Sequence, residues 1–279
     1  MYPVLFEIGG YTVSSFGFMI AVGTLVGTYI ASRRFAEAGY DPELTWTVAV
    51  FIFVGCIVGS KLWFVGERIA RSDGPVDIGA LLGARGGMTF YGGAVGGMLM
   101  LWVGTRVAGL SVWTVVNLVP VAGMVSHALG RIGCFLVGDD YGRPTDLPWG
   151  VAFPEGRPPT LETVHPTMLY ECAWLLLGAW VLHQRRGRSL SPWAEYCIWA
   201  GAGRLAVEQL RLNPAFLGPL SNAQVIALIG VLAGIGLWVY VARLPEPWPY
   251  TARQGDSHTQ AQPTSAAAPR AMKRRRRRA

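Results

Sequence analysis

The chain is poor in charged residues. Only 15% of its 279 residues are Asp, Glu, Lys or Arg, whereas 52% are apolar and the mean hydropathy is positive. Soluble domains carry about 25% charged residues, so this composition excludes an ordinary soluble protein. Apolar runs of roughly 20 residues, the length that crosses a bilayer, recur along the chain. We therefore expect a polytopic membrane protein.

Cysteine is also scarce, and the chain has four residues of this type: Cys56, Cys134, Cys172 and Cys197. They form no CxxC pair and no Cys/His spacing typical of a metal site. We expect buried packing residues, and neither a metal nor an organic cofactor. The first ten residues lack the basic region of a signal peptide, so the first apolar run should remain as an uncleaved span.

The net charge of +7 overstates any basic surface, because Lys273 and residues 274–278 form one terminal cluster. The tail before this cluster is rich in Pro, Ala, Gln, Ser and Thr, a composition that cannot bury a core. We expect residues 1–244 to form the membrane domain and residues 245–279 a disordered basic cytoplasmic tail. Its end could touch anionic headgroups or act only as a topology anchor. The expected partners include the bilayer and no nucleic acid.

The predicted fold class is all-α, with seven transmembrane helices. Basic residues follow the first, fifth and seventh spans, which places those ends in the cytoplasm and the N-terminus outside. Basic residues near the end of the second span go against this rule and are interpreted as functional or as paired with Glu67 and Asp73. The spans are residues 13–32, 43–65, 88–107, 112–133, 165–183, 193–212 and 221–243.

The longest polar connection lies between spans four and five, at about residues 135–164. Residues 149–153 alternate in side-chain character, which is typical of a short strand. Five prolines in this segment bar a long helix. We expect a small extracytoplasmic cap over the membrane.

An arginine lies at the end of span four, where hydrocarbon would be expected. Such a charge is costly in a bilayer, so Arg131 must face the protein interior or water and find an anion. The glycines around it allow sharp turns or close approach of a ligand. The stretch from His127 to Arg143 thus indicates an anion site, unless Arg131 pairs with an acid only to hold two helices together.

A second arginine is predicted at similar depth, because spans four and six run in the same direction. Arg204 and Glu208 are four residues apart and share one helical face. Two guanidiniums with few acids suggest an anionic ligand, and a phospholipid phosphate suits their geometry. A purely structural account would have to pair Glu208 and Asp139 with Arg131 and Arg204. Arg211 should lie nearer the outer surface.

Two more polar residues open spans three and five. Tyr91 precedes Gly92 and Gly93, which open room beside its ring. A tyrosine at a span end is commonly an interfacial residue, and the glycines also fit small-xxx-small helix packing. His165 precedes Pro166 at a predicted helix entry, where it would be either a base or a hydrogen-bonded cap.

Four motifs in this order resemble the prolipoprotein diacylglyceryl transferase family. They are Tyr-Gly-Gly at 91–93, Gly-Arg-Ile-Gly-Cys-Phe at 130–135, His-Pro-Thr-Met-Leu-Tyr-Glu at 165–171, and Gly-x-Gly-Arg-x-x-x-Glu at 201–208. The likeness covers roughly residues 10–243. It implies a multi-pass enzyme of the bacterial cytoplasmic (inner) membrane that acts in lipoprotein maturation. Such an enzyme transfers the diacylglyceryl group of phosphatidylglycerol to the lipobox cysteine thiol of preprolipoproteins and releases glycerol 1-phosphate.

The resemblance and the residue patterns together define a predicted site. Arg131 matches the signature arginine of the family, and Arg204 and Glu208 match its later arginine and acid. The predicted catalytic residues are Arg131, Arg204, Glu208, Tyr91 and His165. The predicted phosphatidylglycerol-binding residues are Arg131, Arg204, Asp139, Gly92 and Gly93.

The chain departs from the family pattern at Phe16, Tyr91, Cys134 and Asp139, where the family often has Tyr, His, Asn and Glu. The general base therefore stays open between Tyr91, His165 and water. These substitutions also support an alternative function, that of an inactive relative that binds lipid or lipoprotein precursors. A second alternative is a transporter of an anionic solute, which usually shows a paired-half repeat.

Overall fold

The computed structural model describes residues 2–9, 11–72, 74–83, 87–185 and 191–244, and the predicted tail lies outside them. Nine helices lie in this part of the chain: α1 (Ser15–Glu37), α2 (Glu43–Ala70), α3 (Ile78–Gly83), α4 (Phe90–Val107), α5 (Val112–Leu118), α6 (Pro120–Val137), α7 (Thr167–Gln184), α8 (Pro192–Glu208) and α9 (Asn222–Ala242). Three antiparallel hairpins accompany them: β1 (Val4–Ile8) with β2 (Tyr11–Ser14), β3 (Val151–Phe153) with β4 (Thr160–Val164), and β5 (Ala215–Leu217) with β6 (Leu220–Ser221).

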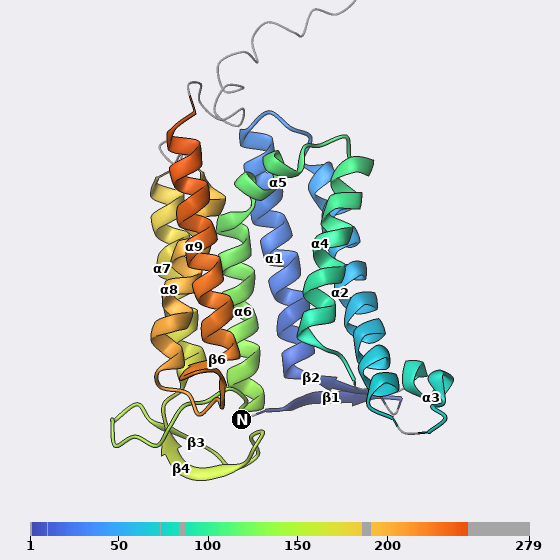
Figure 1. The fold of residues 1–279 in the computed structure, drawn as a ribbon, viewed down its shortest axis with the longest axis vertical. Helices are drawn as coiled ribbons and strands as arrows, with labels where there is room; N and C mark the ends of the chain where they lie inside the picture. The colour runs from blue at the N-terminus through green and yellow to red at the C-terminus, as the bar shows by residue number, and fades with distance from the viewer. Residues whose placement is uncertain (1, 10, 73, 84–86, 186–190, 245–279) are drawn as a thin grey trace, which may run out of the picture.

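The long helices lie alongside one another and form one bundle (Figure 1). Within the described residues, α1, α2, α6 and α9 are each long and apolar enough to cross a membrane, and α4 with α5 makes a fifth candidate if that bent pair is one span. The helices α7 and α8 have 18 and 17 residues, or about 26 Å of helix, and carry buried charges. The helical, multi-pass architecture is confirmed, and the count of seven spans stays a prediction.

The predicted span 112–133 is wrong as one helix. The chain breaks at Val119, and α6 begins at Pro120, because proline has no N–H to donate and its ring crowds the preceding turn. The segment α5 is bent by 113° from α4, and Figure 1 shows it at the end of the bundle opposite the hairpins. Only α6, four residues longer than predicted at its C-terminal end, is long enough to span.

Close packing of α2 against α4 depends on glycine. A side chain on Gly92 would overlap the backbone of Gly59, and one on Gly93 would overlap the Ser60 hydroxyl. The predicted lipid-binding glycines therefore both face α2, as small-xxx-small packing requires. An apolar groove of about 830 Å³ runs along this helix pair, and Gly92 lines it.

The two ends of the bundle differ. The C-terminal ends of α1, α7 and α9 lie together at one end, and the three hairpins lie at the other (Figure 1). Arg34, Arg185 and Arg243 lie at the C-terminal ends of α1, α7 and α9. The basic residues that were predicted to lie on one side are therefore at the same end of the bundle. Which end faces the cytoplasm stays a prediction.

The connection between α6 and α7 contains the hairpin β3–β4. The strand expected at residues 149–153 is present as β3, and its partner β4 was not predicted. The predicted pairing of Glu67 is also present, since its Oε1 lies 2.8 Å from Nη2 of Arg71. The extracytoplasmic position of the cap stays a prediction, and Asp73 lies outside the described residues.

Candidate functional site

The loop after α6 turns sharply. Gly138 closes the helix with φ of 68° and donates its N–H to the Cys134 carbonyl, as a left-handed helix cap does. Asp140 also has a positive φ, of 64°. Asp and Asn tolerate this conformation better than other non-glycine residues. The turn sets the direction in which the Asp140 carboxylate points.

The same loop is attached to two distant segments. Gly142 donates its N–H to the His165 carbonyl, and Arg143 donates its N–H to the Leu210 carbonyl. A side chain on Gly142 would overlap Leu210 and Thr167, so glycine is needed for this approach. The residues after α6, before α7 and after α8 therefore meet at the hairpin end of the bundle.

Three arginines and three carboxylates alternate there in a closed cycle, which we call the charge ring. In the first half, Nη1 of Arg131 lies 2.9 Å from Oδ2 of Asp140, and its Nη2 lies 3.2 Å from Oε1 of Glu171. The other Glu171 oxygen lies 3.1 Å from Nη1 of Arg204. The ring members, in order, are Arg131, Glu171, Arg204, Glu208, Arg211 and Asp140.

The second half closes the ring. Nη2 of Arg204 lies 3.2 Å from Oε2 of Glu208, and the same oxygen lies 3.8 Å from Nη1 of Arg211. Nη2 of Arg211 bonds to Oδ1 of Asp140. Three positive and three negative charges make the ring formally neutral, which lowers the cost of holding it inside a membrane protein.

The six side chains of the ring differ in exposure. Those of Glu208, Arg211 and Glu171 are 1%, 3% and 5% exposed, and those of Arg131 and Arg204 are 16% and 20% exposed. Asp140, at 44%, is the most exposed member of the ring.

One of the two buried carboxylates has further donors. Oε1 of Glu208 accepts from the Ser221 hydroxyl at 2.7 Å and from the Asn213 amide. Nε2 of His127 lies 3.6 Å from Oε1 of Glu171 and forms an ion pair with it only when the imidazole is protonated. The hydrogen bonds hold Glu208 in place, and each of the two carboxylates lies between two arginines and orients them.

The structure brings together three of the predicted site residues, Arg131, Arg204 and Glu208. Arg211, predicted to lie nearer the outer surface than Arg204, follows the end of α8, and its side chain is only 3% exposed. The chain reverses after α8, and the backbone of Gly142 bridges to Arg211, so the loop after α6 covers this arginine. The burial of Arg211 therefore depends on residues 139–142, and the position of Arg211 relative to α8 does not predict it.

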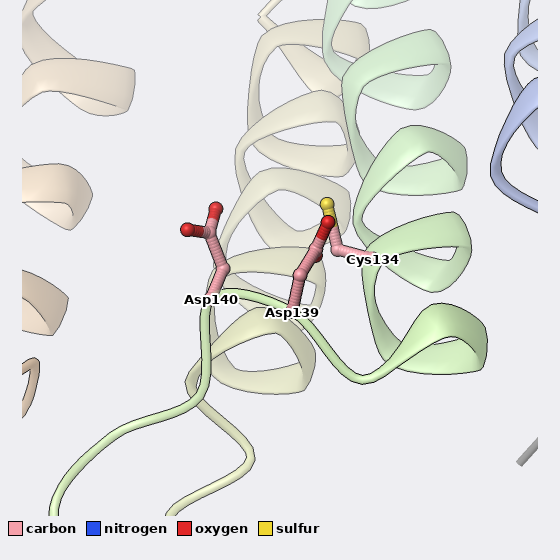
Figure 2. Close-up of side chains that lie close together, drawn as sticks. All are labelled: Cys134, Asp139 and Asp140. Carbon is pink, nitrogen blue, oxygen red and sulfur yellow. The ribbon is translucent and has the colours of Figure 1, made fainter. Parts of the chain in front are cut away.

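Asp139, the predicted acid, lies beside the ring and not in it. Figure 2 shows its side chain directed at Cys134, while the Asp140 carboxylate is turned the other way. Burial raises the pKa of Asp139, although a hydrogen bond from the Cys134 thiol opposes the shift. Burial also acts to raise the pKa of Asp140, but the charges of Arg211 and Arg131 outweigh it and lower that pKa. Asp140, not Asp139, is the counterion of the arginines.

Tyr91 and His165 are not members of the charge ring. The Tyr91 hydroxyl accepts from the side chain of Asn222, which follows Ser221, a donor to Glu208. The His165 ring lies 3.2 Å from the Tyr170 hydroxyl. Tyr91 is thus linked to the edge of the ring through the first residue of α9. His165 contributes its backbone carbonyl, which accepts from Gly142 and holds the loop after α6 in place.

The donor atoms of Cys134, Asp139 and Asp140 lie within 4.8 Å of one another, and this is the described cluster that could hold a metal (Figure 2). Both oxygens of Asp140 already bind arginines, and Nη1 of Arg131 lies 3.8 Å from the Cys134 sulfur. Neighbouring guanidiniums repel a cation, so this cluster is poorly suited to a metal.

Sequence reasoning missed Glu171, Asp140 and His127 as site residues. Glu171 ends the motif 165–171, and His127 lies four residues before Arg131 and so shares its helical face, which is a sequence signal for both. No sequence signal separates Asp140 from Asp139, because the backbone turn decides between them.

The fold and the site define a multi-pass helical membrane protein with a buried arginine–carboxylate centre. The family model described as prolipoprotein diacylglyceryl transferase matches residues 3–240. The chain belongs to this family.

Relatives named phosphatidylglycerol–prolipoprotein diacylglyceryl transferase are similar over most of the chain. The one from Gloeobacter violaceus is 33% identical over 246 residues, which cover 85% of this chain and 91% of the relative. The one from Trichormus variabilis is 33% identical over 265 residues, which cover 88% of this chain and 92% of the relative. The one from Clostridium tetani is 32% identical, with 84% and 96% covered.

Proposed function

We propose that this protein transfers the diacylglyceryl group of phosphatidylglycerol to the lipobox cysteine thiol of preprolipoproteins and releases glycerol 1-phosphate. The observation that carries the proposal is the set of guanidiniums gathered from α6, α8 and the following turn in a membrane protein of this family. The relatives' names supply the two substrate classes. The alternative functions, an inactive relative and an anion transporter, gain no support from the described residues.

The reaction is a displacement at carbon. The substrate thiolate attacks the glycerol carbon that bears the phosphate ester, since the thiolate is the nucleophilic form. The carbon–sulfur bond forms, the carbon–oxygen bond breaks, and the bonding electron pair leaves on the phosphate oxygen. The thiol proton passes to a base and balances the charge of the released glycerol 1-phosphate.

The arginines stabilise the negative charge that grows on the leaving phosphate, the type of electrostatic term that is usually largest in catalysis. Arg131 and Arg204 lie on two different helices, and Glu171 holds one guanidinium with each of its oxygens. Glu208 fixes Arg204 from the other side. These carboxylates orient the arginines before the substrate arrives, so little reorganisation is left for the reaction step.

Tyr91, His165 and water remain the candidate bases. Tyr91 is favoured by its link through Asn222 to the edge of the ring. We also propose that Gly92 meets the lipid through its acyl chains, because it lines the apolar groove. Gly93 and Asp139 remain proposed lipid contacts.

The proposed topology has the N-terminus outside the cytoplasmic membrane and the cap over the ring on the extracytoplasmic side. The gathering of basic residues at the opposite end of the bundle supports it. Thiols of secreted precursors would then reach the site from the side on which they emerge.

A direct assay tests the function. Purified protein in lipid vesicles is supplied with phosphatidylglycerol labelled in its acyl chains and with a lipobox peptide, and the thioether product is measured. We expect labelled peptide from the parent protein, none from a peptide with serine in place of cysteine, and little from Arg131→Gln. Folded parent protein that forms no product would contradict the proposal.

A further inference from the structure

We infer that Asp140 occupies, in the ligand-free protein, the position that the substrate phosphate takes during the reaction. The phosphate subsite is then the space between Arg131 and Arg211, and binding is an exchange of one anion for another. This inference rests on the proposed function and adds to it the place and the manner in which the phosphate binds.

The first argument is the shape and charge of the two anions. One oxygen of Asp140 binds Arg131 and the other binds Arg211. A phosphodiester also has two terminal oxygens that share one negative charge, so it could bridge the same guanidiniums. The exchange would leave the charge ring neutral. No unpaired charge would be created in the protein interior.

The second argument is the accessibility of the three carboxylates. Glu171 and Glu208 are buried between two arginines each, and Glu208 also accepts from Ser221 and Asn213. Releasing either would leave several buried donors without an acceptor, which is costly. Asp140 is 44% exposed, and its carboxylate forms ion pairs with Arg131 and Arg211. Asp140 is thus the carboxylate that can leave at least cost.

The third argument is an unused donor. Nε of Arg131 is buried and has no hydrogen-bond acceptor among the described residues. Buried polar atoms without a partner are uncommon and call for an explanation. A carboxylate has only two oxygens, whereas a phosphodiester has two ester oxygens besides its terminal pair. Phosphate would therefore offer acceptors that Asp140 lacks.

The backbone at Asp140 makes the exchange a side-chain movement. Its carbonyl accepts a hydrogen bond from the Thr167 hydroxyl, and the contacts of Gly142 and Arg143 attach the loop to the residues before α7 and after α8. The carboxylate can therefore turn outward, toward the side where it is already exposed, while the loop stays in place.

The test compares Asp140→Asn with Asp146→Asn in the transferase assay. Asparagine keeps the size of the side chain and tolerates the positive φ, but it has no charge. Asp146 is an exposed carboxylate in the same connection and serves as the matched control. If Asp140 occupies the subsite in about nine-tenths of the ligand-free molecules, removing the competitor lowers the KM for phosphatidylglycerol about tenfold.

The inhibition constant of glycerol 1-phosphate should fall in the same variant, and Asp146→Asn should match the parent in both quantities. If Asp140→Asn does not fold, Asp140→Gly takes its place, because glycine accepts the positive φ without strain. A folded, active variant whose KM and inhibition constant equal or exceed those of the parent overturns the inference. An inactive parent would instead overturn the proposed function, so the two failures are distinguishable.

Discussion

Replacing Glu171 with glutamine should destabilise the protein strongly. The side chain is 5% exposed and lies between the guanidiniums of Arg131 and Arg204, at 3.2 and 3.1 Å, with His127 nearby. Glutamine keeps the shape but leaves two arginines without their shared counterion, and the charge ring acquires a net charge of +1. Removing one partner of a buried ion pair costs about 3–5 kcal/mol, so we expect a loss of this size in the free energy of unfolding.

The assay is reversible unfolding in mixed detergent micelles, with Glu162→Gln on the exposed face of β4 as the control. A second variant tests the cause. Glu171→Gln combined with Arg204→Gln restores neutrality, so its loss should be smaller than the sum of the single losses by about 0.5–3 kcal/mol. A loss below about 1 kcal/mol in Glu171→Gln, or strict additivity in the double variant, would refute the assigned coupling.

Three further predictions concern the arginines, the topology and acid pH. Replacing any arginine of the charge ring with lysine removes the planar guanidinium and should lower the rate of transfer about tenfold or more, equivalent to about 1.4 kcal/mol. The control variant, Arg143→Lys at an exposed position, should keep the parent rate. Full turnover by a ring variant would remove that arginine from the phosphate site. A reporter fused after Arg243 should be cytoplasmic and one within residues 142–157 extracytoplasmic, and a cytoplasmic signal from the second would contradict the proposed site. The pKa of Asp140 is lowered on folding because the charges of Arg211 and Arg131 outweigh the opposing effect of burial, so its stabilisation is present above the unfolded pKa of about 3.9 and is lost as pH falls through the folded value. The difference in Tm between the parent and Asp140→Asn should accordingly shrink below about pH 4, and a difference that does not change with pH would be evidence against this coupling.

The helices were largely predictable because hydropathy is a local property of the sequence. Segments 43–65, 88–107 and 221–243 agree with α2, α4 and α9 to within a few residues at each end. The break before Pro120 was missed for a physical reason. Residues on both sides of it are apolar, so hydropathy continues through the point where the backbone hydrogen-bond ladder stops.

The charge ring was predictable only in part. The proximity of Arg131 and Arg204 follows from the direction of their helices, and this proximity is observed through Glu171. The identity of the counterions depends on helix rotation about the long axis and on one backbone turn. The positive φ of Asp140 directs it, and not Asp139, at the arginines. Such tertiary choices leave no periodic pattern in the sequence.

A closed ring of six charges is not explained by stability alone. Buried ion pairs contribute little compared with apolar residues of the same volume, because desolvation offsets most of their attraction. The ring does keep three guanidiniums charged, oriented and close together in a membrane protein, where isolated arginines would be excluded. Two carboxylates of the ring, Glu171 and Glu208, are buried, and the third, Asp140, is 44% exposed. An arrangement that is neutral when empty and has one exchangeable anion suits a site that must admit a lipid phosphate without ever burying an uncompensated charge.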